Sequence, residues 1–386
     1  MHHRTLHTQV SHKTTPYFAN IDPQLLQRSM ELIAMPSTHE QPAARNKALE
    51  YIADIVRTYP GITIEQFKEQ GVRSFLAYAG PQRPDRFKVL LNGHVDVVPG
   101  NDSQFAPYVR DNRLYGRGSL DMKISALVLT KVFCELAPTL DYPLGLQIVT
   151  DEEPGGYNGA QYQYRQGVRT DFFITGEQSH NDIAIAAKGM CRLVITQKGV
   201  PAHSAYLWRG ENAILKLTDL IAKLHALYPV PDKEAWATTV NVSKLETTSE
   251  GFINRVPHAA ELHLDIRPIL GDPNFDSFAH MRAFFASLDP TAEIISATLV
   301  QGHEVEPTHP MLQSLIAATE RAKGKPVELL RRHGQSDICH YTADPHTRGV
   351  EFGLTGAHDH ADNEYLELSS VPIMEQALRY FLPSLS

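Results

Sequence analysis

The sequence predicts an α/β fold of two domains, in which a larger α/β/α domain is interrupted by a smaller α+β domain. The 386 residues exceed what one hydrophobic core usually holds. Apolar segments of strand length alternate with helical segments up to about residue 190 and again after about residue 302, whereas the stretch between has another pattern. We therefore place the first part of the larger domain at 1–188, the inserted domain at 189–302 and the second part at 303–386.

The larger domain begins with two helices over 22–59, because apolar residues recur there at helical spacing and Pro36 interrupts them. The segment 87–100, FKVLLNGHVDVVPG, starts as a continuous apolar run and ends in Pro-Gly, which predicts a buried strand that leads into a loop. A helix over 125–137 and a strand over 144–150 follow. In such sheets, helices cover both faces and functional residues lie beyond the carboxyl ends of the strands.

The inserted segment begins with the strand pattern CRLVITQKG and contains two helices, over 212–227 and 275–288. Apolar and polar residues alternate over 238–247 and 260–268, which predicts two further strands with one buried face. Helical spacing resumes in MLQSLIAATERA, and the last predicted helix runs over 370–381. The return to the first pattern indicates that the α+β segment is an insertion.

Composition excludes several classes of function. The formal net charge is −8, and no basic block is present, so a nucleic acid or an anionic membrane is not expected as a partner. Cys134, Cys191 and Cys339 form no CxxC pair and are expected to be reduced thiols. No segment has the roughly 20 apolar residues that span a bilayer, and the N-terminal residues are polar, so the predicted location is the cytoplasm.

Residues of the kind that bind metals follow the predicted strands. His94 and Asp96 are two positions apart at the end of a strand, so their side chains share one face. That spacing suits a metal-bound imidazole and the carboxylate that orients it. Taken alone, the pair is more often a surface histidine and a helix-capping aspartate. Asp121, which precedes an apolar helix, would alone be assigned as an N-cap.

Further acids and histidines stand at other strand ends. The three adjacent acids 151–153 repel one another unless a cation lies between them. Glu177 ends the apolar strand DFFITGEQ, and His358 and His360 follow EFGLTG. Oxygen and imidazole donors without cysteine are typical of catalytic zinc. A phosphate-binding loop in EPGGYNGA is disfavoured, because no GK[ST] follows and the preceding acids would repel phosphate.

Six segments occur in the order and with the spacing of a known family: GHVDVVP, YGRGSLDMK, TDEEPGG, GVPAHSA, the NRVP and DIRP pair, and HADNE. Over nearly its whole length the chain resembles the di-zinc aminoacylases, acetylornithine deacetylases, succinyl-diaminopimelate desuccinylases and glutamate carboxypeptidases. The resemblance implies a zinc-binding catalytic domain with an inserted lid and dimerisation domain. It also implies two zinc ions per chain, for which cobalt or manganese can substitute.

The resemblance also assigns roles in the metal site. Asp121 bridges the two ions, and the remaining ligands are His94 and Glu177 for one ion, and Glu153 and His360 for the other. Glu152 is the general base, and Asp96 assists His94. His360 is preferred as the ligand because it stands four residues before Glu364, and His358 remains the alternative. A cis peptide between Asp121 and Met122 is also implied.

The inserted domain is expected to contribute to substrate binding. By resemblance, His203 enters the active site of the partner subunit in a homodimer formed through this domain; without the flanking motif it would be equally compatible with a surface loop. Asn254 and Arg267 match residues that hold the polar groups and the carboxylate of the substrate. Two departures concern substrate preference. No proline follows AHS, and SDICHY has Ile338 and Cys339 where Asp-x-Arg is often found.

The resulting hypothesis is an N-acyl-amino-acid deacylase, in which a metal-bound hydroxide attacks the amide and Glu152 acts as general base. The substrate is then a small N-acyl amino acid or a short peptide. A metallo-carboxypeptidase or dipeptidase with the same metals is the alternative. A non-catalytic binding relative is expected to have lost a ligand or the base, and this sequence retains them all.

Overall fold

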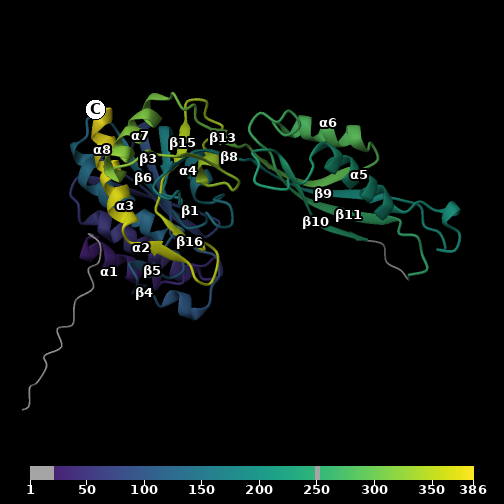
Figure 1. The fold of residues 1–386 in the computed structure, drawn as a ribbon, viewed down its shortest axis with the longest axis horizontal. Coiled ribbons are helices and arrows are strands. Elements are labelled where there is room, and N and C mark those ends of the chain that lie inside the picture. Colours follow the sequence, from purple (N-terminus) through teal and green to yellow (C-terminus); the bar gives the residue numbers. More distant parts are fainter. Residues whose placement is uncertain (1–20, 248–252) are drawn as a thin grey trace, which may run out of the picture.

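The chain forms a broad first domain and an elongated second domain that extends from one side of it (Figure 1). The computed structural model describes residues 21–247 and 253–386. The predicted α/β class with two domains is confirmed. The strand that ends at Ala187 and the strand that begins at His303 both belong to the sheet of the first domain. This supports the boundaries after residues 188 and 302, which we retain as a proposal.

The first domain is built on a mixed nine-stranded sheet. Its strands, in spatial order, are β1 (Ile62–Glu69), β2 (Val72–Ala79), β6 (Leu144–Val149), β3 (Phe87–His94), β7 (Thr170–Thr175), β15 (Arg348–Glu351), β8 (Ile183–Ala187) and β13 (His303–Glu304), and β14 (Leu329–Arg332) also pairs with β8. The four central strands, from β6 to β15, are parallel. Of these, β3, β6 and β7 are apolar along most of their length, as expected of strands that are covered on both faces.

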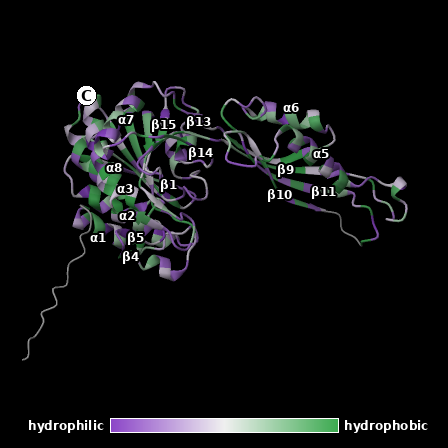
Figure 2. Cartoon of the chain, viewed as in Figure 1, coloured by the Kyte–Doolittle hydropathy of each residue, from purple (hydrophilic) through white to green (hydrophobic). Residues whose placement is uncertain are grey.

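Helices cover the two faces of this sheet unequally. One face packs against α1 (Pro23–Ile33), α2 (Pro42–Arg57), α3 (Lys123–Leu136), α7 (Pro310–Lys323) and α8 (Ser370–Phe381). The other face packs against the short α4 (Ala160–Arg165) and η4 (Asp337–His340). Figure 2 shows hydrophobic residues concentrated in the central strands and in the helices over them. The prediction of helices on both faces is confirmed, with most of the core on one side.

A small sheet that the sequence analysis did not predict lies beside the first. Its strands are β16 (Gly356–Ala357), β17 (Tyr365–Glu367), β5 (Arg113–Tyr115) and β4 (Tyr108–Arg110). Tyr365 lies opposite Tyr115 in the antiparallel pairing of β17 with β5. This pairing brings the turn after β5, which contains Asp121, next to the loop that contains His360.

The second domain is a four-stranded antiparallel sheet with helices on one face. In order, its strands are β10 (Thr239–Thr247), β11 (Ala259–Arg267), β9 (Met190–Lys198) and β12 (Glu293–Val300). The helices α5 (Ala213–Leu227) and α6 (Phe278–Leu288) bury alternate residues of β11, from Ala260 to Ile266. Asp265 and Arg267 therefore lie on the opposite, open face of the sheet. The predicted helices and strands are confirmed, and β12 was not predicted.

Two sequence predictions concern the surroundings of the protein. None of the helices in residues 21–247 and 253–386 is long and apolar enough to span a bilayer. The three cysteines form no disulfide, as expected, and Cys134 and Cys191 are buried. The N-terminal segment that contributed to the cytoplasmic prediction lies outside the described residues, and that prediction is not tested.

Candidate active site

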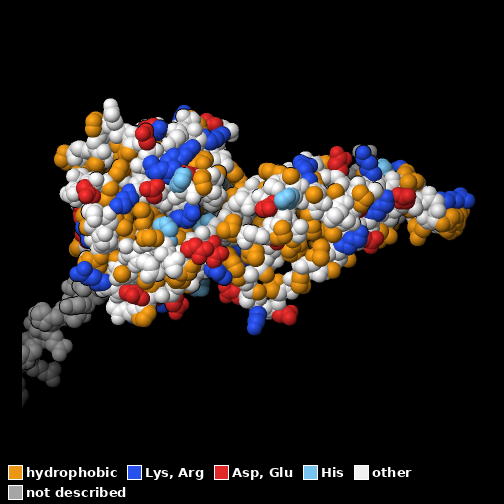
Figure 3. Space-filling model, turned by 90° about the horizontal axis from the view of Figure 1, so that it is seen from above, with side chains coloured by type: hydrophobic (Ala, Val, Ile, Leu, Met, Phe, Trp, Pro, Cys, Tyr) orange, Lys and Arg blue, Asp and Glu red, His pale blue; other side chains and the backbone are white. Residues whose placement is uncertain are grey.

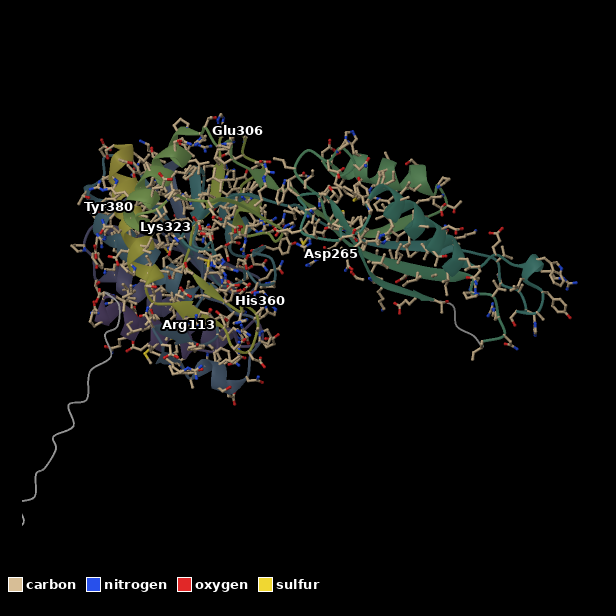
Figure 4. The ribbon with its side chains drawn as sticks, in the orientation of Figure 1. Arg113, Asp265, Glu306, Lys323, His360 and Tyr380 are labelled. Atoms are coloured by element: carbon tan, nitrogen blue, oxygen red, sulfur yellow. The ribbon has the colours of Figure 1, made fainter. Side chains whose placement is uncertain are left out.

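A cleft of about 440 Å³ lies between the two domains. The first domain contributes the residues predicted to bind metal, and the second contributes Met190, Arg192, Arg267 and Val300. Figure 4 shows His360 and Asp265 on the facing sides of the two domains. Seen from above, acidic side chains gather close to the junction of the domains (Figure 3). The cleft therefore joins a strongly acidic region to a wall that carries arginines.

His94, Asp121 and Glu177 form the first group of possible metal ligands. His94 is the last residue of β3, and Glu177 follows β7, so the ends of two neighbouring parallel strands bring them together. His94 Nε2 lies 3.0 Å from Asp121 Oδ1 and 3.4 Å from Glu177 Oε1. His94 Nδ1 lies 3.0 Å from the backbone oxygen of Asp96. If Nδ1 carries the proton and donates it there, Nε2 is left as the ligand atom.

Asp96 was expected to orient His94 through its carboxylate, but the closer contact is made by its backbone oxygen. Its carboxylate Oδ1 lies 3.6 Å from His94 Nδ1, so the backbone oxygen of Asp96, at 3.0 Å, is the closer partner. Its Oδ2 instead accepts a hydrogen bond of 3.1 Å from the backbone N–H of Glu153. β3 ends at His94, so the alternation of a strand no longer fixes the direction of the side chain at 96. Asp96 thus holds both His94 and the segment of Glu153.

Asp121, Glu153 and His360 form the second group. His360 Nε2 lies 3.1 Å from Asp121 Oδ2 and 3.3 Å from Glu153 Oε2. The two oxygens of Asp121 thus face the two groups separately, which is the arrangement that a bridging ligand needs. His358 lies apart, with its ring centroid 5.8 Å from that of Tyr365. Of the two candidate histidines, the structure brings His360 to the site.

The electrostatics of these groups fit divalent cations. Burial raises the pKa of Glu153 and Glu177. Contacts with Asp121 and Glu153 raise the pKa of His360 to about 10. Burial opposes the ionisation of Asp121, but His360 and His94 outweigh it and lower the pKa of that carboxyl. Each group offers only oxygen and imidazole donors, whose atoms all lie within 4.8 Å of one another. The residues therefore suit two divalent cations that share Asp121.

A buried ion pair fixes the turn that carries Asp121. Glu364 lies 2.6 Å from Arg117, and both side chains are almost fully buried. The Glu364 carboxylate also accepts hydrogen bonds of 2.9–3.2 Å from the backbone N–H groups of Gly118, Leu120 and Asp121. No peptide bond in the described ranges is cis, so the expected cis bond between Asp121 and Met122 is wrong here. The Glu364 contacts hold the turn that carries Asp121.

Glu152 lies beside the first group but belongs to neither group. Its Oε2 is 3.9 Å from His94 Nε2, and the side chain lines the cleft with 17% of its surface exposed. Burial, reinforced by the negative charge of Glu177, raises the pKa of Glu152 well above its usual value. The carboxylate is therefore next to the possible metal ligands and open to a substrate in the cleft.

The three residues predicted in the second domain lie in different places. Arg267 lines the cleft, and Asp265 accepts hydrogen bonds of 2.7 Å from its Nε and 3.2 Å from its Nη2. His203 and Asn254 are exposed and do not line the cleft of the same chain. Their two segments are joined by a hydrogen bond of 2.8 Å from the backbone N–H of Ser204 to the backbone oxygen of Asn254. Donation of His203 to a partner subunit stays a prediction.

Several residues of the cleft were not singled out from the sequence. They are Arg192, Arg332, Asp337 and His340. Asp337 Oδ2 accepts a hydrogen bond of 3.0 Å from Asn92, and burial raises its pKa to about 8. Arg332 ends β14, and Asp337 and His340 follow it in the stretch RRHGQSDICH, of which only SDICHY led to a prediction, about substrate preference. The adjacent Arg331 and Arg332 were the only feature of this stretch that could have indicated a cationic position in the cleft.

Residues 90–383 match the sequence profile of Peptidase family M20/M25/M40. The chain belongs to this family. A succinyl-diaminopimelate desuccinylase of Alteromonas mediterranea is 27% identical over 350 residues, which cover 84% of this chain and 88% of the relative. A probable carboxypeptidase of Paracoccidioides brasiliensis is 28% identical over 61% of this chain and 58% of its own length.

The solved structure of the M20 metallo-carboxypeptidase Sso-CP2 from Sulfolobus solfataricus has the same fold. Its TM-score is 0.73 at 16% sequence identity, and the match covers 94% of this chain and all of that chain. M20 peptidases are metal-dependent hydrolases that act on amide bonds. The prediction of a metallohydrolase acting on an amide bond is therefore confirmed at the level of the M20 family.

Proposed function

We propose that this M20 enzyme binds two divalent cations, zinc in the first instance, and removes the acyl group from an N-acyl amino acid. The observation that carries this proposal is the pair of ligand groups that share Asp121 beside Glu152, at the floor of a cleft whose other wall contains Arg267. The desuccinylase relative, which matches over 88% of its own length, supports a deacylase.

In this mechanism, Glu152 transfers the proton and Arg267 binds the carboxylate of the substrate. Bound cations would polarise the amide carbonyl and acidify a water molecule. Glu152 takes the proton from the attacking water and passes it to the leaving nitrogen. Asp265 holds one edge of the Arg267 guanidinium through Nε and Nη2, so Nη1 and the second edge remain for the carboxylate of the substrate. Binding of the substrate carboxylate to Arg267 thereby fixes the distance between the scissile bond and Glu152.

A carboxypeptidase or dipeptidase is the second candidate, because a probable carboxypeptidase is among the relatives. The zinc-loaded enzyme should be assayed on N-acetyl and N-succinyl amino acids beside dipeptides of the same amino acids. A deacylase gives the higher kcat/KM on the acyl amino acids. Higher values on the dipeptides would favour the peptidase. Absence of turnover on every substrate would identify a binding relative and contradict the proposed function.

Arg267→Lys is expected to raise KM for the preferred substrate by about 10-fold or more. A point ammonium cannot keep the paired bonds to Asp265 and also offer a flat edge to a carboxylate. Steady-state kinetics test this, with Arg282→Lys on the exposed face of α6 as control. A KM that stays within about twofold of the unmodified enzyme would make Arg267 a structural partner of Asp265 only.

Mixing inactive His203→Ala with inactive Glu152→Gln chains is expected to restore part of the activity. If His203 enters the site of a partner, a mixed dimer contains one site with both residues intact. Subunit exchange should be measured separately by mass spectrometry of differently tagged chains. Proven exchange without recovered turnover would argue against donation of His203 across a dimer.

A further inference from the structure

Arg332 brings a positive charge into the cleft from the first domain. It is the last residue of β14, along which exposed and partly buried residues alternate. Arg331 points outward and pairs with Glu304 at 2.7 Å, whereas Arg332 lines the cleft. The pairing of β14 with β8 shifts register between Leu330 and Arg331. Such irregularities redirect side chains and are common beside active sites.

The Arg332 guanidinium is oriented by an ion pair with a buried glutamate on its side away from the cleft. Its Nε lies 3.2 Å from Oε2 of Glu351, the last residue of β15, whose side chain is only 3% exposed. No second ion pair or side-chain hydrogen bond of Arg332 occurs within the described parts of the chain. A guanidinium has five N–H donors, so the contact at Nε leaves both Nη groups able to donate into the cleft. Glu351 thus fixes the direction of the group without using its outer edge.

The cleft therefore has guanidinium groups on both domains, and on the second domain Arg192 lies beside Arg267, with its Nε 3.4 Å from Oδ2 of the same Asp265. Arg267 stands on the wall of the second domain, anchored by Asp265, and Arg332 stands on the wall of the first domain, anchored by Glu351. Both have about a third of the side chain exposed, which is enough for a ligand to reach them. In each case an acid behind the guanidinium orients an edge that is suited to a planar carboxylate.

Cys339 lines the same cleft as Arg332. Burial raises the pKa of the Cys339 thiol well above its usual value, so position 339 supplies no charge near neutral pH. Arg332 supplies a cation at another position in the same cleft.

We propose that Arg332 determines specificity by binding a second carboxylate, so that the substrate is a linear amide with an acidic group on each side of the scissile bond. An N-succinyl amino acid is the simplest probe of this class: Arg267 holds the carboxylate of the amino acid, and Arg332 holds that of the acyl group. The inference rests on the proposed function and narrows its substrate.

The test uses the zinc-loaded enzyme with the N-succinyl and N-acetyl forms of one amino acid. The unmodified enzyme is expected to prefer the succinyl form. Arg332→Gln is expected to lower kcat/KM for the succinyl form by about 10–100-fold, the usual effect of losing hydrogen bonds to a charged group, and for the acetyl form by less than about 3-fold. Arg331→Gln, on the same strand but facing outward, should change neither value.

Equal losses on both substrates would overturn the proposal, because Arg332 would then serve only to pair Glu351 and support the site. Unchanged kinetics of Arg332→Gln would overturn it as well. If the unmodified enzyme hydrolyses neither substrate, the proposed function fails, and calorimetry with succinate and acetate still tests Arg332. Succinate should bind at least about 10-fold more weakly to Arg332→Gln than to the unmodified protein, with acetate unaffected. Equal succinate affinities would overturn the assignment.

Discussion

Glu152→Gln is expected to lower kcat by at least about 10²-fold while the bound metal and the substrate affinity stay near their original values. The amide keeps the shape of the side chain but cannot accept a proton from the attacking water. General acid–base catalysis by a positioned side chain contributes about 10²–10⁴-fold, which sets the expected loss. The 3.9 Å between Glu152 Oε2 and His94 Nε2 places the carboxylate close enough for this role.

Metal analysis and kinetics on the same preparation decide the role of Glu152. Loss of one metal ion from Glu152→Gln would make Glu152 a ligand and Glu153 the candidate base. Near-normal kcat with both ions present would show that another group carries the proton. A change confined to KM would indicate that Glu152 contacts the substrate in the ground state.

Removal of the metal by a chelator is expected to abolish turnover, with a loss of more than about 10³-fold, and to leave most of the fold intact. Polarisation of a carbonyl by a bound ion is worth several kcal/mol in the transition state. The apolar core lies between the sheet and its helices and includes none of the proposed ligands. About two ions per chain and an unchanged far-UV spectrum after chelation would agree with this. Full activity with one ion or none would contradict the two-metal site.

The metal-free protein should also lose thermal stability as the pH rises from 5 to 9. Burial raises the folded-state pKa of Glu152, Glu153 and Glu177 above the unfolded value, and contacts with Asp121 and Glu153 raise that of His360 to about 10. The folded state then binds more protons than the unfolded state, so the free energy of unfolding falls as pH rises. The lowered pKa of Asp121 affects the free energy of unfolding only at acidic pH, below the range measured.

Melting temperatures across this pH range, with and without zinc, measure the effect. With cations bound, the carboxylates are stabilised in their ionised form, so the pH slope of the loaded protein should be smaller. Equal slopes for the two forms would mean that the ions do not bind among these carboxylates.

The sequence was sufficient to predict the elements that carry the site. Continuous apolar runs such as β3 and β7 are long enough to be recognised. His94, the last residue of β3, and Glu177, two residues after β7, stand at the predicted strand ends. The convergence of these ends follows from parallel pairing. Choosing His360 over His358 depended on the resemblance, since both follow the same strand.

Other features depend on contacts that periodicity does not encode. The strands β16 and β17 have two and three residues, too few to show an alternation, although they bring the two halves of the site together. The short contact of His94 with the Asp96 backbone oxygen arises beyond the end of β3, where the strand rule no longer applies. Arg332 becomes a cleft residue only because the second domain forms the opposite wall.

The insertion also affects when the metal site is completed during synthesis. Asp121 and His360 are 239 residues apart in the sequence, and the whole second domain is made between them. At about 5–20 residues per second, the ribosome takes roughly 12–48 s to cover this interval. Once Glu177 has been made, the nascent chain has His94, Asp121, Glu153 and Glu177, but until the end of this interval it lacks both His360 and the Glu364 anchor of the turn. The second ligand group can therefore be completed only after the second domain has been synthesised.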